Sequence, residues 1–496
     1  MPILEILKPM TFGQWVAEDE VDQLASYFVE TDHWNRLFLD LVDIIYGPKG
    51  SGKSALYSLL VDRRDALFIR HTILAPAENP RGTPAFRTLV TDPPATEREF
   101  IDLWKLYLAC IISNAFDEFG IQSPDTKLVE TILANSGLKT KEWNLQSVLK
   151  FVFDYVKRFR PSAIEGGIAI DPGTQSPSGI TGKISFDEPS SKQAEEGISS
   201  VDSLLKLEDK ALQQYGYKIW ILLDRLDVAF SDSPRLEQNA LSALFHVYLD
   251  LLALKNLKIK IFLRTDIWRR ITTSGFREAS HITRALTISW DEASLINLIV
   301  RRALQNDGLI KHYNIDRANV LSSTKSQEGF LYKIFPDQID VGSRKPKTLQ
   351  WIFGRIRDGT KQCAPRELVH LLNVLRNTQV RRIEVGDQEP EGGKLFARSV
   401  FKEALQEVSR NRLEQTVYAE YPALKDSIEK LRNQKTQHNP ESLSRIWKIS
   451  REDTKQRAQE LVEIGFFERK GDLENPVYWV PLLYRNALNL IQGSAE

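Results

Sequence analysis

A glycine-rich octapeptide is the stretch of this chain whose residue types and spacing point most directly to chemistry. It reads Gly-Pro-Lys-Gly-Ser-Gly-Lys-Ser over Gly47–Ser54, between an apolar run at Leu41–Tyr46 and a helical pattern at Ser54–Leu60. A strand, a G-x-x-x-x-G-K-[ST] loop and a helix form the context in which such a loop binds phosphates. Its glycines let backbone N–H groups converge on an anion, and the helix N-terminus adds partial positive charge. The pattern predicts a nucleoside triphosphate site.

The side chains of this loop predict ATP and Mg²⁺ as ligands. Lys53 is expected to reach the β- and γ-phosphates, and the Ser54 hydroxyl is expected to ligate Mg²⁺. The nucleotide-binding residues predicted here are Gly47, Pro48, Lys49, Gly50, Ser51, Gly52, Lys53, Ser54 and Ala55.

A second apolar run, Lys218–Asp224, ends in a carboxylate. A continuous apolar run of this kind predicts a strand buried in a parallel sheet, with Asp224 at its carboxyl end. There the aspartate is expected to hold Mg²⁺ together with Ser54. Asp227 is our candidate for orienting or deprotonating the attacking water, and the alternative is that it caps the following segment.

Further polar residues are placed to contact the nucleotide. Arg264, Thr265 and Asp266 follow the apolar run Ile259–Leu263, and we expect one of them to read the γ-phosphate or position water, with Arg264 and Asp266 as catalytic candidates. Arg366 follows Pro365 at the start of a helix, a favourable position for proline. It is predicted either to point back at the nucleotide or to form a surface salt bridge.

Two more arginines, Arg277 and Arg284, allow a contact with the nucleotide of a neighbouring subunit, although exposed arginines are usually just solvated. His281 has no second histidine or cysteine at ligand spacing, which favours a structural role.

The order of elements predicts an α/β fold: a P-loop NTPase with an AAA-like parallel sheet, a helical insertion and a helical lid, followed by an α+β winged-helix domain. We expect the ATPase core over residues 1–287, with a helical and β-hairpin insertion at about 95–205. The lid is expected at 288–383 and the winged-helix-containing domain at 396–496. Finer predictions are a strand at Ala66–Arg70, helices at 97–115 and 145–159, a helix carrying Val21, Leu24, Ala25 and Phe28, and a hairpin with arms Ile168–Ile170 and Lys183–Phe186.

The C-terminal pattern is a helix over Glu441–Trp447, a capping motif at Ser450–Asp453, a second helix ending at Gly465 and a hairpin over Phe466–Val480. Winged helices commonly read DNA with their second helix. Basic and acidic side chains nearly balance over residues 439–496. Nucleic acid binding through this domain therefore stays open beside contact with a protein.

Bulk composition restricts the location and the class of protein. The 496 residues have a net charge of +0 and are 42% hydrophobic, which suits several real cores and gives no chain-wide attraction for nucleic acid. Two cysteines, Cys110 and Cys363, suit a reducing compartment. With no signal-like N-terminus and no long apolar run, we expect a cytoplasmic protein without a membrane segment.

The succession of Gly47–Ser54, Asp224, Arg264–Asp266, Pro365–Leu368 and the winged-helix pattern resembles AAA-like and STAND-like ATPases, including the origin-recognition type. It looks most like bacterial P-loop ATPases found in antiphage defence loci. The resemblance implies ATP-dependent oligomerisation or conformational switching that controls an effector protein in trans, with a homo-oligomer as the expected assembly. Many hydrolysing relatives have a glutamate near Asp227, where this chain has Val228, so the resemblance leaves room for a slow switch. A DNA-engaging loader or initiator is the alternative.

Overall fold

The fold was analysed in a computed structural model of the 496-residue chain. The structure describes residues 2–13, 32–77, 96–139, 152, 184–186, 189–191, 199–226, 234–472 and 475–495. Contacts divide the chain into two compact units. A sheet unit contains Asp32–Gly47 and Lys53–Thr287, and a helical unit contains Met1–Thr31, Pro48–Gly52 and Ile288–Glu496.

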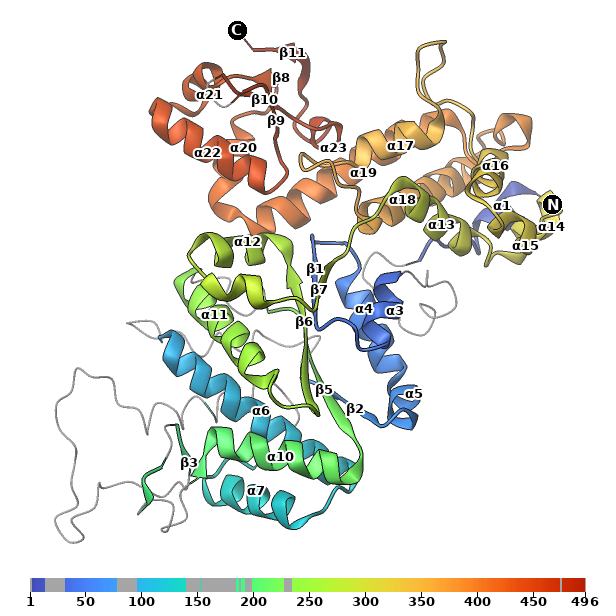
Figure 1. Cartoon of the computed structure of the whole chain (residues 1–496). Coiled ribbons are helices and arrows are strands. Elements are labelled where there is room, and N and C mark those ends of the chain that lie inside the picture. The colour runs from blue at the N-terminus through green and yellow to red at the C-terminus, as the bar shows by residue number, and fades with distance from the viewer. Residues whose placement is uncertain are drawn as a thin grey trace. The chain divides into compact units, whose positions relative to one another are not determined.

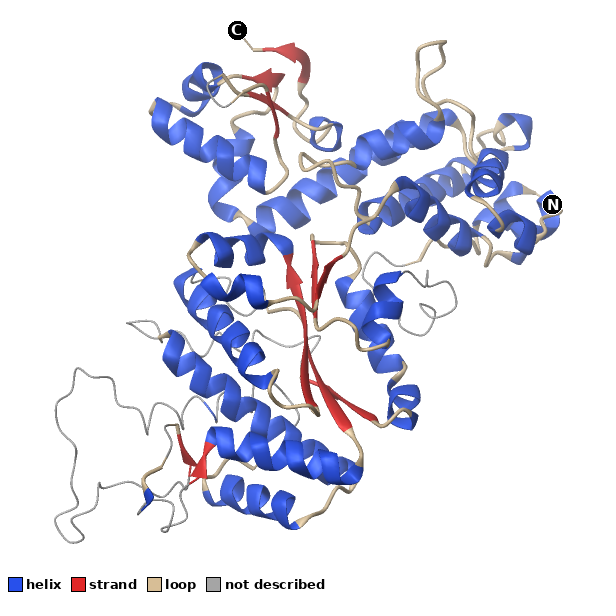
Figure 2. Cartoon of the chain, in the orientation of Figure 1, coloured by secondary structure: helices blue, strands red, loops and turns tan. Residues whose placement is uncertain are grey.

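The sheet unit is built on five parallel strands in the order β2-β5-β6-β1-β7 (Figure 2). Every residue of β5 after Lys218 is buried, which explains its uninterrupted apolar sequence. The parallel α/β fold expected from the sequence is confirmed. The strands are β1 Ile44–Gly47, β2 Thr72–Pro76, β5 Lys218–Leu223, β6 Leu257–Arg264 and β7 Ala285–Thr287.

Helices cover both faces of this sheet, and one apolar core joins them to the strands (Figure 1). One face carries α3 (Asp32–Phe38), α4 (Lys53–Asp62) and α5 (Arg64–Ile69). The other carries α6 (Glu97–Phe119), α10 (Val201–Tyr215) and α11 (Pro234–Leu251), with α7 (Pro124–Asn135) against α6 and α10. The predicted helix at 97–115 is α6, which starts at a Thr96–Glu99 capping box and ends before left-handed Gly120. After β6 come α12 (Thr265–Thr273) and the 3-10 helix η4 (Arg277–His281).

The strand predicted at Ala66–Arg70 is wrong, because these residues lie in and after the short helix α5 and the strand β2 begins at Thr72. Leu67 is buried while Ile69 is 79% exposed, so one face of a helical turn packs inward. The prediction failed because a short apolar run does not distinguish a strand from a helical turn.

Several predicted elements lie outside the described residues. These are the helix around Val21–Phe28, the helix at 145–159 except Val152, and the hairpin arm Ile168–Ile170. From the second arm, β3 (Ile184–Ser185) pairs in parallel with β4 (Ser199–Ser200).

A buried ion network closes the amino end of the sheet. Lys260 on β6 has no exposed side-chain surface, and its Nζ lies 2.8 Å from carboxylate oxygens of both Asp40 and Asp43. Arg284 Nε donates to Asp43 Oδ2 at 2.6 Å. Burial by itself would raise the pKa of Asp40, but Lys260 and Lys258 outweigh it and hold that pKa below its usual value. Because the partners share one desolvated site, each one depends on the others.

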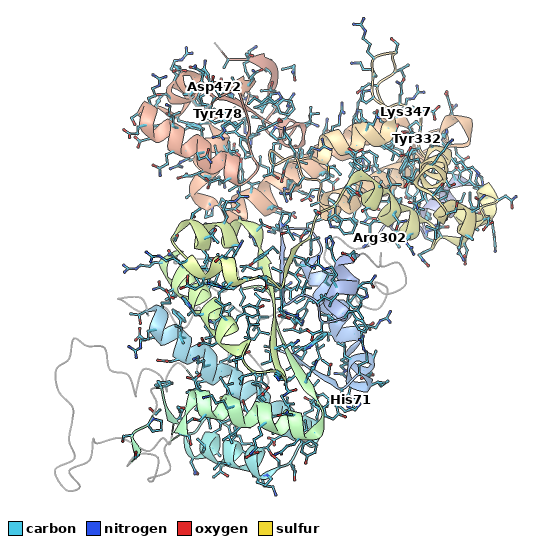
Figure 3. All side chains as sticks on the ribbon, viewed as in Figure 1. His71, Arg302, Tyr332, Lys347, Asp472 and Tyr478 are labelled. Carbon is cyan, nitrogen blue, oxygen red and sulfur yellow. The ribbon has the colours of Figure 1, made fainter. Side chains whose placement is uncertain are left out.

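The helical unit has a single apolar core that includes the N-terminal helix, the lid helices and the C-terminal elements. The sequence placed residues 1–287 in one core and residues 396–496 in a separate domain, whereas the contacts group the N-terminal segment with Ile288–Glu496. Ile3 N donates to Glu389 Oε1 at 2.9 Å, and Arg302 Nη1 donates to the Phe12 carbonyl (Arg302 is labelled in Figure 3). The helices are α1 Ile3–Leu7, α13 Glu292–Ala303, α14 Asp307–Tyr313, α15 Arg317–Leu321, α16 Thr324–Ile334, α17 Thr348–Ile356, α18 Pro365–Glu384, the 3-10 helix η5 Glu391–Gly393 and α19 Arg398–Asn411.

The chain continues from α19 through a π-helix, η6 (Arg412–Tyr418), and the 3-10 helix η7 (Pro422–Leu424) into a C-terminal module, residues 425–495. Here α21 and α22 lie where the sequence predicts them, and the antiparallel pair β9–β10 forms the predicted hairpin. Ser450 caps α22 by accepting from Asp453 N, as expected. The module contains α20 Lys425–Glu429, β8 Lys435–His438, α21 Pro440–Trp447, α22 Arg451–Glu463, β9 Glu468–Lys470, β10 Val477–Trp479, α23 Leu482–Arg485 and β11 Ile491–Ser494.

No helix within the described ranges combines the length and apolar character needed to cross a membrane.

Replacing the buried cation of the ion network tests its role in stability. We expect Lys260→Met to lower the free energy of unfolding by about 3 kcal/mol or more, because it removes the fully buried ammonium group that pairs with both Asp40 and Asp43. Lys258→Met is the matched control: Lys258 also pairs with Asp40, but its side chain is 22% exposed, so we expect a smaller loss. Urea unfolding measures both, and equal losses would contradict this assignment.

His370 on α18 predicts a pH dependence of stability. Burial lowers its pKa to about 4, and its Nε2 lies 3.3 Å from Asn411 Nδ2. An unfolded histidine titrates near pH 6.5, so the unfolded chain gains a proton first as the pH falls. The neutral, buried His370 therefore stabilises the fold fully above about pH 6.5, and this stabilisation is lost as the pH falls toward about 4. At about pH 5 the free energy of unfolding is expected to be lower by on the order of 2 kcal/mol. In His370→Gln, the unfolding temperature is expected to fall less steeply than in wild type as the pH drops from about 6.5 to about 4. An unchanged pH dependence would contradict this role of His370.

Candidate phosphate-binding site

The glycine-rich loop has the geometry that its sequence predicts. It runs from the end of β1 at Gly47 to the start of α4 at Lys53. Gly50 and Gly52 have φ values of +78° and +98°, in the region that favours glycine. Lys53 Nζ donates to the Gly47 carbonyl at 2.8 Å, which holds the ammonium group across the loop. A curled backbone, a lysine and a helix N-terminus together make an anion site.

Asp224 and Ser54 are 170 residues apart and lie side by side. Ser54 Oγ donates to Asp224 Oδ2 at 3.0 Å, and the Asp224 residue is buried. Ser54 is in the first turn of α4, and Asp224 directly follows β5, at the carboxyl edge of the sheet. Mg²⁺ prefers hard oxygen ligands and usually takes only one or two from the protein, with phosphates and waters completing its octahedron. This donor pair therefore fits the predicted ion.

The backbone turns sharply after Asp224. Arg225 adopts a left-handed conformation with φ +54°, uncommon for a residue with a side chain. Such conformations cluster at functional sites, and no local sequence pattern predicts this one. Asp227, the predicted water-orienting residue, lies outside the described residues.

The residues after β6 occupy the edge expected of them. β6 lies between β1 and β5, and the register places Arg264 beside Gly47. Arg264 and Asp266 form a two-point ion pair, with Nε–Oδ1 and Nη2–Oδ2 distances of 3.0 and 2.8 Å. Sequence reasoning treated them as separate candidates and missed this pairing. The Thr265 hydroxyl between them is buried and has no hydrogen-bond partner among the described residues.

Within the helical unit, side chains from distant segments contact the loop residues Pro48–Gly52. Trp290 Nε1 donates to the Ser51 carbonyl at 2.8 Å, and Lys49 forms an ion pair with Glu420. A Cβ added at Gly50 would lie 3.0 Å from Arg366 Cβ, so Arg366 is packed directly against the loop. Neither Trp290 nor Glu420 was predicted, because no motif or spacing links them to the loop.

Of the two arginines considered for a neighbouring subunit's nucleotide, Arg284 is held by contacts within its own chain. It precedes β7 at the amino end of the sheet, and its guanidinium binds Asp43 and the Asp40 carbonyl. Arg277 lies exposed in η4, and His281 is also exposed. The position of Arg284 follows from long-range pairing, which the local sequence does not reveal.

Comparison with known proteins gives weak structural similarity. Neither the protein-family models nor the curated proteins match this chain. Among solved structures, the chain is similar to the Aeropyrum pernix ORC1 protein in complex with DNA, with 13% identity, a TM-score of 0.36 and coverage of 98% of this chain and 96% of that one. It is also similar to a Walker-type ATPase of Pyrococcus abyssi, with 12% identity, a TM-score of 0.39 and coverage of 98% and 100%. A third similar structure is the Aeropyrum pernix ORC2 protein in ADPNP–ADP complexes, with 12% identity, a TM-score of 0.36 and coverage of 98% of this chain and 96% of that one. Scores this low carry no argument about function, so the fold and the site rest on the geometry described above.

Adding a methyl group inside the loop tests its geometry. We expect Gly50→Ala to weaken ATP binding at least about tenfold, because the positive φ costs about 1–2 kcal/mol and the new Cβ meets Arg366. Gly120→Ala is the matched control, because Gly120 has φ +67° but ends α6 with open space around it. The control should lose stability in thermal unfolding while its ATP affinity stays at the wild-type value. Wild-type affinity in Gly50→Ala would show that the loop is not the binding site.

Proposed function

We propose that this chain is an ATP-binding and slowly hydrolysing regulatory ATPase. The observation that carries the proposal is the 3.0 Å contact between Ser54 and Asp224 beside a loop with the phosphate-binding conformation. It unites two predicted magnesium ligands that are far apart in sequence, next to a lysine and a helix N-terminus. This combination suits a nucleoside triphosphate with its divalent cation.

In this proposal each residue of the site has a separate task. Backbone N–H groups of the loop residues Lys49–Ser54 and the Lys53 ammonium hold the phosphates, while Ser54 and Asp224 hold Mg²⁺, which neutralises charge on the phosphate oxygens. Asp227 orients or deprotonates the attacking water. One of Arg264, Thr265 and Asp266 senses the γ-phosphate or positions water, and Thr265 is well placed because its buried hydroxyl has no hydrogen-bond partner within the described part of the chain.

The output of such a site is a change of conformation or of oligomeric state that controls a partner effector. Arg366 supports this idea, because a side chain packed on Gly50 is positioned to respond to a nucleotide in the loop. We place the protein among regulatory ATPases of antiphage defence on the sequence resemblance alone. In the same proposal the ATPase assembles as a homo-oligomer and acts on an effector protein in trans.

A DNA-engaging loader or initiator is the second candidate. It is favoured by the two helices and hairpin of the C-terminal module, since Arg451 and Lys455 are exposed on α22. Arg451, however, pairs with Glu441 at 2.7 Å, and Glu452 and Asp453 are exposed on the same helix. A duplex-binding face needs several cations that neutralise phosphates, so the charge of α22 fits a protein partner better.

Steady-state ATP turnover tests the proposed activity. We expect slow, Mg²⁺-dependent turnover in the wild type that falls at least about 100-fold in Lys53→Ala and in Asp224→Asn. Loss of Lys53 removes a phosphate contact, and loss of the Asp224 charge removes a magnesium ligand. Lys218→Ala is the matched control, because Lys218 is an exposed lysine at the opposite end of β5 and its loss should leave turnover unchanged.

Adding duplex DNA to the same assay separates the two candidates. Turnover indifferent to DNA supports the regulatory switch, and strong stimulation that Arg451→Ala and Lys455→Ala abolish supports the loader. Turnover that survives Lys53→Ala would contradict both.

A further inference from the structure

The π-helix η6 connects two charged side chains that are linked to the glycine-rich loop through two different sets of contacts, called here the first and the second route. It continues α19 without a break, from Arg412 to Tyr418, and Glu420 follows two residues later. π-helical turns are rare and frequently occur at functional sites. The residues concerned, including Lys49 and Gly50, all belong to the helical unit.

The first route starts at Arg412. Its Nη1 donates to Glu367 Oε1 at 2.6 Å, and the side chains of Arg412 and Glu367 are only 11% and 6% exposed. A second carboxylate, Asp358, lies 4.0 Å from Arg412 Nη2. Glu367 directly follows Arg366 on α18, the helix that packs beside α19 (Figure 1). This buried pair therefore fixes the start of α18, where Arg366 meets Gly50.

The second route starts at Glu420. Its carboxylate pairs with the ammonium group of Lys49, and the two side chains are 15% and 31% exposed. Lys49 directly precedes Gly50 in the loop. The contacts and the chain together form a closed ring. Glu420 contacts Lys49, whose chain neighbour Gly50 meets Arg366. The next residue, Glu367, pairs with Arg412, and η6 connects Arg412 back to Glu420.

The π turn explains how one helix serves both routes. Glu420 comes eight positions after Arg412, and in an α-helix two such residues point about 80° apart, since each residue turns the helix by about 100°. A π turn takes up about one extra residue, which makes the pair equivalent to positions seven apart, about 20° from each other. The π turn therefore brings Arg412 and Glu420 onto nearly the same face.

We propose that Glu420 and Arg412 are positioning residues for the phosphate-binding loop, and that η6 is the brace that carries them. The brace acts through Lys49 and through Glu367, holds the loop backbone in its binding conformation, and makes ATP affinity depend on the segment leading into the C-terminal module. By linkage, a nucleotide in the loop stabilises the braced form of η6 to the same extent. The inference rests on the proposed ATP site.

Reversing the charge of Glu420 distinguishes the brace from simple electrostatic attraction between a charged side chain and the triphosphate. Glu420→Lys brings a positive charge close to the loop, and attraction for the triphosphate by itself would tighten ATP binding. The brace predicts the opposite, about tenfold weaker binding, because Lys49 then faces a like charge and the loop loses its support. The swapped pair Lys49→Glu with Glu420→Lys restores the ion pair and should recover most of the wild-type affinity.

The control is Glu414→Lys, which makes the same charge change at an exposed residue of η6 and should leave ATP affinity unchanged. Thermal unfolding of each variant confirms that the affinities refer to folded protein.

Titration of the 496-residue chain with ATP and Mg²⁺ measures the affinity of every variant. Weaker binding in Glu420→Lys and recovery in the swapped pair support the brace. Equal or tighter binding in Glu420→Lys, or a swapped pair no better than the single variant, overturns it while the ATP site stands. No ATP binding by the wild type overturns the proposed function, and the brace with it.

Discussion

The glycine-rich loop constrains the rest of this structure, because its backbone N–H groups converge only in one curled conformation. Gly50 and Gly52 make that conformation accessible, and β1 and α4 fix its two ends. The parallel sheet then brings Asp224 to the same edge, where the Ser54 hydroxyl meets its carboxylate. A single hydrogen bond across 170 residues thus depends on the register of the central strands.

Buried charges do much of the positioning in both units. At the amino end of the sheet, Lys260 holds Asp40 and Asp43 together, while at the carboxyl edge Arg264 and Asp266 pair with each other. In the helical unit, the Glu367–Arg412 pair lies next to the residue that packs on Gly50. Buried ion pairs contribute little net stability compared with apolar packing, but breaking one is costly, so each of them specifies a single arrangement.

The sequence was most informative where residue type and backbone conformation are tied together. The glycine-rich loop, the buried strand before Asp224 and the capped helix α22 were all predicted close to their observed bounds, since each has a local physical signature. The strand expected at Ala66–Arg70 failed because a short apolar run fits either kind of element. The roles of Glu420, Trp290 and Arg284 depend on contacts between distant segments, and one sequence has no signal for these.

Hydrogen exchange of the 496-residue chain with and without a non-hydrolysable ATP analogue and Mg²⁺ tests the central claim most directly. We predict slower exchange in Gly47–Leu60, because a nucleotide engages the loop N–H groups and orders the first turn of α4. The same protection should disappear when Mg²⁺ is withdrawn or when Asp224 is changed to Asn. Exchange in Gly47–Leu60 that is the same with and without the analogue, at concentrations up to the millimolar range, would contradict the claim that this loop binds a nucleoside triphosphate.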